Sequence, residues 1–520
     1  MRLVDSALWE THELKIGRVH WRANLDALPK NVDGSLTDWA MVQRGHWSAV
    51  VENAGGVFGI TDNLRSFPIL YSQSEDPMVS STPTPLLAAL DEPRRDLIAA
   101  WEFLYGGYLL GSQTLISGIS SVEAGAITDL QTGKIVDTYR QPTSYEEADA
   151  DPLEYMRHFY EVVIKAFEPL ASSGRQLLVP LSGGADSRLI MLVLKEAGAK
   201  NVLAFTYGTP GSPEVKISRQ VAESAGYRWK GIELNREKVH QRWVNPKNGD
   251  FLRATWSGEA LPHIQDWYAL QVLKQDPEVH EDAVVLPGHT IVGNEHGDEL
   301  LSLGPVSAGD AADLITAHHF NLRGASKASE LPDSLQLKIR EFLDEKWIPD
   351  EAGHNSKALV ELNLATRQAR YINNSMRGYE YFGFDWALPM LTADPWETWL
   401  SGPRRIHTED RRYYVEFINE EFGRVFETDL EYFMPPAGKI EPKRKQKIKS
   451  VLSAVGLLGP LTNMARIRTE RRHPMVFEAL AGNLSQREFE MKLLRGCRTL
   501  GIFCELFIAN EWVPGQKVVP

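Results

Sequence analysis

The first part of the chain alternates short apolar runs with turn-forming residues. Up to about residue 140, apolar stretches of strand length are separated by Gly, Asn, Asp and Pro. The clearest of them run from Trp47 to Val51, from Gly56 to Thr61 and from Ile69 to Ser72. Short apolar runs bounded by turn residues are typical of strands. We therefore predict an antiparallel, sheet-rich domain over residues 1–145.

A polar segment separates this region from the rest of the chain. Residues 141–152 are acidic and bounded by prolines, which is the composition of a solvated linker. Apolar residues then recur at helical spacing up to Phe167. We place a second domain at residues 153–520.

This second domain begins with predicted strands and helices in alternation. They cover residues 176–181, 188–197, 202–206, 214–225, 229–234 and, after a gap, the strand 283–287. Such alternation predicts a doubly wound parallel sheet, whose ligands bind at the carboxyl ends of the strands. Beyond Gly304 the pattern is mostly helical. The predicted fold class is therefore α/β and α+β: a sheet-rich domain, a parallel sheet and a helical C-terminal portion.

Composition narrows the class of function. The chain has 520 residues, 43% of them apolar and 24% charged, as expected of a folded protein of more than one domain. Its net charge of −13 disfavours nucleic acid as a partner. The cysteines, Cys497 and Cys504, are too few for a disulfide framework and indicate reduced core residues. Asp5 interrupts any leader, and no apolar window is long enough for a transmembrane segment, so we expect a cytoplasmic protein.

One predicted turn between a strand and a helix is suited to binding phosphate. It reads Ser182-Gly183-Gly184-Ala185-Asp186-Ser187. Its glycines let the backbone approach oxygen atoms, its hydroxyls donate hydrogen bonds, and the helix N-terminus carries a partial positive charge. Asp186 would repel phosphates unless a divalent cation lay between them, so the loop predicts ATP with Mg²⁺. The alternative is a Ser/Gly-rich turn that binds nothing.

These residues resemble the Ser-Gly-Gly-x-Asp-Ser signature of the PP-loop ATP pyrophosphatases, and the loop lacks the lysine of an ordinary ATPase loop. The resemblance implies an adenine nucleotide α-hydrolase-like sheet, ATP cleavage between the α- and β-phosphates, and Asp186 as a metal ligand. It also implies an adenosine site at the end of the next strand, where Thr206 and Tyr207 are candidates; a strand end and a turn aromatic are the alternative. The candidate nucleotide-binding residues are Leu181, Ser182, Gly183, Gly184, Asp186, Ser187, Thr206, Tyr207 and Gly288.

The first domain resembles the glutaminase domain of asparagine synthetase. The similar segments are residues 45–51, 59–71 and 113–119, in the same order and spacing, which implies an Ntn-hydrolase-like fold. In the working glutaminase a cysteine follows Met1 and attacks the glutamine amide. Here Arg2 stands at that position, and no cysteine precedes Cys497. We therefore expect a degenerate domain without glutaminase activity, as in the β-lactam-forming relatives, which serves as a packing or gating surface.

Residues 369–380 and 386–389 resemble the helical segment that closes the synthetase site over the acceptor carboxylate in asparagine synthetase-like proteins, particularly those of bacterial polysaccharide and natural-product pathways. The resemblance implies that Arg377 holds a carboxylate or phosphate. It further implies that Glu380, alone or with Tyr379, takes a proton from the attacking amine. The alternative is an amphipathic helix with a surface arginine and glutamate.

Two further candidates follow from the same resemblance. Asp298, in Asn294-Glu295-His296-Gly297-Asp298, matches the acidic part of a loop that supplies a second metal ligand; the alternative is a solvated acidic turn. Lys443 or Lys445, in a basic run, is the candidate for stabilising negative charge as the acyl-adenylate collapses. For this run a solvated loop and a peripheral membrane contact are the alternatives.

The sequence thus predicts an ATP-dependent carbon–nitrogen ligase similar to asparagine synthetase. A substrate carboxylate is adenylated, and ammonia or an amine displaces AMP. The expected partners are a small-molecule carboxylate and its nitrogen donor, with a homodimer or a separate ammonia-supplying protein as further possibilities. The alternative function is a catalytically silent ATP-binding scaffold or regulatory pseudoenzyme of a biosynthetic complex.

Overall fold

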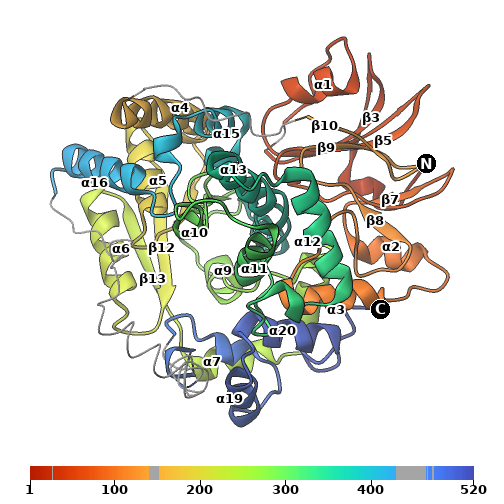
Figure 1. The fold of residues 1–520 in the computed structure, drawn as a ribbon. Helices are drawn as coiled ribbons and strands as arrows, with labels where there is room; N and C mark the ends of the chain where they lie inside the picture. The colour runs from red at the N-terminus through yellow and green to blue at the C-terminus, as the bar shows by residue number, and fades with distance from the viewer. Residues whose placement is uncertain (26, 140–150, 429–463, 465–466, 471–472) are drawn as a thin grey trace.

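The computed structural model describes residues 1–25, 27–139, 151–428, 464, 467–470 and 473–520 (Figure 1). Within these residues the strands form three sheets. Two of them lie in the N-terminal region, residues 1–139, and the third lies in the C-terminal region, residues 151–520.

The larger N-terminal sheet is antiparallel, with the order β10-β9-β5-β4-β3-β2. Its core contains Trp21, which stacks on Trp47 at a centroid distance of 4.9 Å, and Trp39 of α1, which packs edge-on against both rings. Burial of these three indoles fixes which face of the sheet meets α1. The elements are β2 (Glu10–Leu14), β3 (Gly17–Ala23), α1 (Leu36–Val42), β4 (Trp47–Asn53), β5 (Gly56–Thr61), β9 (Ala126–Asp129) and β10 (Ile135–Thr138).

The smaller sheet has the order β1-β7-β6-β8. Its strands are β1 (Arg2–Leu3), β6 (Leu70–Ser72), β7 (Met78–Ser80) and β8 (Ile119–Ser121), accompanied by η1 (Ser6–Leu8), α2 (Pro83–Ala89) and α3 (Leu97–Gly106). The predicted sheet-rich region is confirmed, and its three clearest runs form β4, β5 and β6. It is not purely antiparallel, because β1 pairs in parallel with β7.

The third sheet is parallel, in the order β13-β12-β11-β14-β15, which confirms the predicted parallel sheet. Helices α4, α5 and α16 pack against one another beside it, and α6 contacts β12 and β13 (Figure 1). The chain order reverses between β11 and β14, and doubly wound sheets bind ligands at such a point. The elements are α4 (Pro152–Ser172), β11 (Leu177–Pro180), α5 (Ala185–Glu196), β12 (Val202–Gly208), α6 (Pro213–Ser224), β13 (Arg228–Glu233), β14 (Val284–Val285), β15 (Asp385–Trp386) and α16 (Arg412–Phe426).

Helices make up most of the remaining described chain, as predicted. The longer ones are α7 (Arg236–Trp243), α8 (Asn248–Thr255), α9 (Trp267–Lys274), α11 (Ala308–His319), α12 (Asp333–Lys346), α13 (Ala352–Asn363), the π-helix η3 (Leu364–Ile372), α15 (Ala393–Leu400), α19 (Gln486–Leu494) and α20 (Thr499–Ile508). The shorter ones are α10 (Asp298–Leu301), η2 (Ala328–Glu330), η4 (Asn373–Ser375), α14 (Met376–Tyr381), η5 (Pro389–Leu391), η6 (Arg404–Ile406) and η7 (Phe477–Leu480). Among the described residues, none of the helices combines the length and apolar character needed to cross a membrane.

The two regions share a hydrophobic core. Helix α3 packs against α20, with the Phe103 and Phe507 rings 5.9 Å apart, so α20 lies beside the N-terminal region (Figure 1). Phe67 likewise contacts Trp386 of β15. Residues 140–150 of the predicted linker lie outside the described chain, so the division at residues 145 and 153 stays a prediction.

Candidate active site

The loop after β11 is held in shape by its own hydroxyl groups. The Gly184 amide donates to Ser182 Oγ at 3.1 Å, and the Ser182 amide donates to Ser187 Oγ at 3.2 Å. The two serine oxygens are themselves 3.1 Å apart. Gly184 then caps α5, whose first amides point toward the loop because they have no partner within the helix. The loop therefore has the form of an anion-binding turn.

Gly288, which follows β14, lies next to this loop. An added Cβ on Gly288 would lie 3.7 Å from the Ser187 amide nitrogen and 3.8 Å from the Asp186 Cβ. The segment that follows β14 and the start of α5 are thus close to van der Waals contact, at the point where the chain order of the sheet reverses. Three of the nucleotide-binding candidates therefore lie side by side.

Asp186 is paired with an arginine from far along the chain. Arg411 Nη1 lies 3.0 and 3.1 Å from the two carboxylate oxygens of Asp186. Arg411 precedes α16 and has a left-handed backbone, with φ of 52°. Its side chain passes so close to Gly293 that an added Cβ there would clash with it. Arg411 was not predictable from the sequence, because no local pattern marks a partner 225 residues away.

Asp298 lies next to the same segment. Its carboxylate accepts a hydrogen bond from the Glu409 amide at 2.7 Å. Burial raises the pKa of Asp298, and the nearby Glu295 and Asp410 carboxylates raise it further, against the effect of the Glu409 amide. A carboxylate whose pKa is raised by neighbouring carboxylates lies in an environment that a bound cation stabilises. The segment 409–411 therefore contacts both candidate metal ligands, Asp186 and Asp298, whose metal-binding role stays a prediction.

Thr206 directs its hydroxyl into the protein. Thr206 Oγ1 lies 2.7 Å from both the Leu181 carbonyl oxygen and Ser218 Oγ, and it accepts from Trp229 Nε1 at 3.2 Å. These contacts fix the end of β11 directly before the loop. A nucleotide contact through this hydroxyl stays a prediction, and its present partners are all protein groups.

Tyr207 and Tyr379 converge on a carboxylate that the sequence did not indicate. Both phenols donate to Asp266, which lies immediately before α9, and the Tyr379 bond measures 2.7 Å. Burial raises the pKa of both phenols well above its ordinary value, and the Asp266 charge adds to this. Burial lowers the pKa of His289, which follows Gly288, to about 4. The nearby His263 also lowers this pKa, whereas the Asp266 carboxylate raises it. This polar cluster carries groups able to hold or move a proton.

Arg377 and Glu380 are engaged with the N-terminal region. Arg377 stacks on the Phe67 ring at 4.9 Å and donates to the Ser66 carbonyl at 3.1 Å, and burial lowers its pKa to about 10. Glu380 pairs with Arg377 at 2.9 Å and accepts from Trp386 Nε1 at 2.9 Å. Their predicted roles as carboxylate-binding group and base stay predictions. Lys443 and Lys445 lie outside the described residues.

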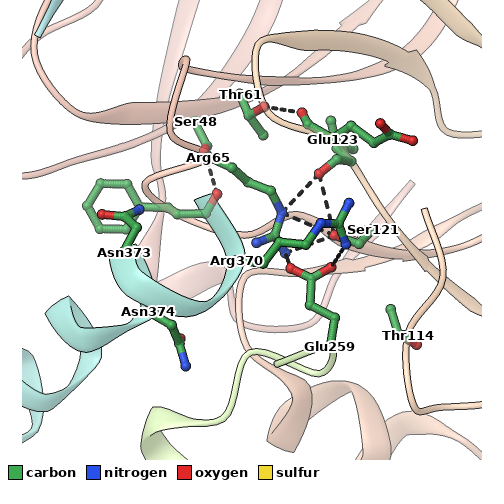
Figure 2. A network of polar contacts seen from close by, with 12 residues as sticks. Ser48, Thr61, Arg65, Thr114, Ser121, Glu123, Glu259, Arg370, Asn373 and Asn374 are labelled. Carbon is green, nitrogen blue, oxygen red and sulfur yellow. Dashed lines mark hydrogen bonds and ion pairs between the residues drawn. The ribbon is translucent and has the colours of Figure 1, made fainter. Parts of the chain in front are cut away.

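A buried ion triad joins the two regions (Figure 2). The Glu259 carboxylate forms an ion pair with Arg65 of the N-terminal region and accepts a hydrogen bond at 2.6 Å from Arg370 of the π-helix. Arg65 also donates to Ser121 Oγ at 2.8 Å, and Figure 2 shows the two guanidinium groups approaching Glu259 from different segments. Burial lowers the pKa of Arg65 to about 10, opposed by the Glu259 charge. The N-terminal region is therefore held through charged groups as well as through the shared core.

A cavity of about 620 Å³ lies between the regions as well. Asn63 and Gly125 line one side of it, and Lys338, Glu361 and Thr366 line the other. The loop residues 182–187 are not among those that line it. The cavity is consistent with the predicted packing or gating surface, which stays a prediction.

Comparison with known families bears on the segment that carries the loop. Residues 158–245 match the model of the asparagine synthase family. The match includes β11, the Ser182–Ser187 loop and β12, and supports an asparagine synthetase-like PP-loop assignment for this segment. No curated protein matches the chain.

Among solved structures, the chain is similar to the NH3-dependent NAD synthetase from Campylobacter jejuni, determined in complex with the nitrate ion. The sequences are 15% identical over 37% of this chain and 93% of that chain, with a TM-score of 0.19.

Proposed function

We propose that this chain is an ATP-dependent carbon–nitrogen ligase that adenylates a carboxylate and transfers the acyl group to ammonia or an amine. The observation that carries the proposal is the Ser182–Ser187 loop, which lies where the parallel sheet reverses its order, within the segment similar to asparagine synthase. The loop would hold pyrophosphate on its amides and hydroxyls. A small-molecule carboxylate and a nitrogen donor are the partners this reaction needs.

The donor atoms around the loop suit Mg²⁺, which prefers carboxylate oxygen and phosphate. Asp186 and Asp298 would hold the ion, and the ion would neutralise charge on the phosphates during adenylation. For this to happen, Arg411 must release Asp186, and a phosphate oxygen is a suitable new acceptor for its guanidinium. Arg411 would then orient the polyphosphate.

We assign proton handling to the cluster around Asp266. Asp266 orients Tyr207 and Tyr379, and His289 stays neutral at pH 7 because its pKa is low. The Asp266 carboxylate, with the neutral His289 imidazole close to it, would accept the proton of an attacking amine. We do not propose glutamine hydrolysis, because Arg2 stands where the working glutaminase has its cysteine, and Cys497 and Cys504 are both buried. We further propose a cytoplasmic location, with a homodimer or a separate protein supplying nitrogen.

The test is product formation from Mg-ATP and a panel of carboxylic acids with ammonia or amines. We expect AMP and pyrophosphate in equal amounts, and a loss of roughly a hundredfold in rate for Asp186→Asn, since one metal ligand is removed. The control is Asp282→Asn, an exposed residue outside the loop, which should keep the rate. ATP binding by the chain without any pyrophosphate release would instead support the silent scaffold.

A further inference from the structure

Three histidines gather at one place beside the segment that carries Asp298. His296 lies two residues before Asp298, and His318 and His319 end α11. One ring nitrogen of each lies within 4.8 Å of the other two. Among the described residues, this is the group of three donor side chains whose atoms lie close enough together for a metal ion.

The ring nitrogens of these histidines lack protein partners. The Nε2 atoms of His296, His318 and His319 are buried and have no hydrogen-bond partner among the described residues. His296 and His319 are only 3% and 4% exposed, so water does not replace the missing partners easily. Buried polar atoms without a partner cost free energy, which a bound ion would recover.

Neighbouring groups orient two of the rings for ligation. His296 Nδ1 faces the Asn294 carbonyl oxygen at 3.5 Å, and His319 Nδ1 lies 2.7 Å from the Tyr108 hydroxyl. When Nδ1 carries the proton toward such an oxygen, the lone pair remains on Nε2, which is how metal-bound histidines are usually held. Burial also lowers the pKa of His296 and of His318.

We propose that His296, His318 and His319 form a binding site for a transition-metal ion of the Zn²⁺ type. Three imidazoles suit Zn²⁺, Co²⁺, Ni²⁺ or Cu²⁺ rather than Mg²⁺. Arg367, whose charge also lowers the pKa of all three imidazoles, opposes any cation here, which disfavours ions held mainly by charge. The proposal does not depend on the proposed ATP reaction, because it rests on the three histidines alone.

A metal ion bound to the three histidines would link the C-terminal end of α11 to the segment before α10. The His296 and His318 rings stack at 3.9 Å with an angle of 10° between their planes. A bound metal lies in the plane of each imidazole, so His318 must turn out of this stack, which its partly exposed position permits. The ion would then restrain the segment that carries Glu295 and Asp298.

The experiment uses full-length protein treated with a chelator and then titrated with Zn²⁺ or Co²⁺ alone. We expect one ion per chain and, with Co²⁺, the visible absorption of a four-coordinate site. His296→Gln and His318→Gln should each weaken Zn²⁺ binding by at least about tenfold. His158→Gln, an exposed histidine on α4, is the matched control and should leave the affinity unchanged.

A further variant keeps all three histidines, so its result does not depend on whether the protein folds when a histidine is replaced. Arg367→Met removes the opposing charge and should tighten Zn²⁺ binding. The proposal is overturned if the wild type binds no more tightly than the His296→Gln, His318→Gln double variant, because the ion then has other ligands. Unchanged affinity in Arg367→Met would overturn it as well.

Discussion

The Glu259 carboxylate links the N-terminal and C-terminal regions through a single buried side chain. The Glu259 side chain is 0% exposed, and its carboxylate forms ion pairs with Arg65 and Arg370. We predict that Glu259→Gln lowers the free energy of unfolding by about 3–5 kcal/mol, the usual cost of removing one member of a buried ion pair. Glutamine keeps the volume, but it leaves two buried guanidinium groups without a counter-charge and turns an N–H toward one of them.

The change should be measured as the shift of the urea midpoint, followed by tryptophan fluorescence. A loss of this size is large beside a typical total stability of about 5–15 kcal/mol. The control is Glu13→Gln, which breaks a pair with Arg18 whose side chains are 70% and 57% exposed, and should change stability by less than about 1 kcal/mol. Replacing Glu259, Arg65 and Arg370 together by Met should restore most of the loss. The reasoning is refuted if Glu259→Gln is no less stable than Glu13→Gln.

Three further predictions concern the candidate site. Thr206→Val should cost about 1–2 kcal/mol of stability with little change in the KM for ATP, and Thr206→Ser should restore it; a large rise in KM would mean that the hydroxyl contacts the nucleotide. Asp266→Asn should lower kcat for pyrophosphate release more than it raises the KM for ATP; a change confined to that KM would place Asp266 at the nucleotide instead. His289→Gln should lessen the loss of stability on acidification from pH 7 to pH 5. The wild-type His289 pKa is about 4, below the unfolded value near 6.5, so the unfolded state gains protons first in this range; equal pH dependence in both proteins would contradict this.

The main elements of the fold were predictable because each depends on residues close together in sequence. The run before Ser182 is apolar throughout and forms a strand buried in the parallel sheet, and the two glycines after it predict the turn. The strand β15, Asp385–Trp386, was not predicted, because two residues carry no periodicity. Its position at the sheet edge depends on pairing with β14, which lies about a hundred residues earlier.

The surroundings of the candidate site were not predictable in the same way. Asp266 and Arg411 have no local pattern, and each gains its place only when distant segments pack together. The buried triad around Glu259 likewise unites three segments. A single charged residue in a sequence is expected to be exposed to solvent, and only the fold shows that other segments bury it.

Residue order along this chain is therefore enough to specify a glycine turn between a strand and a helix, and with it the expectation of a bound polyphosphate. Local periodicity and turn chemistry act over a few residues, so they are visible without the fold. The partners of Asp186, Tyr379 and Glu259 were decided by tertiary packing. The reason is that pairing over long separations is selected by the free energy of burying the whole core, which no short segment contains.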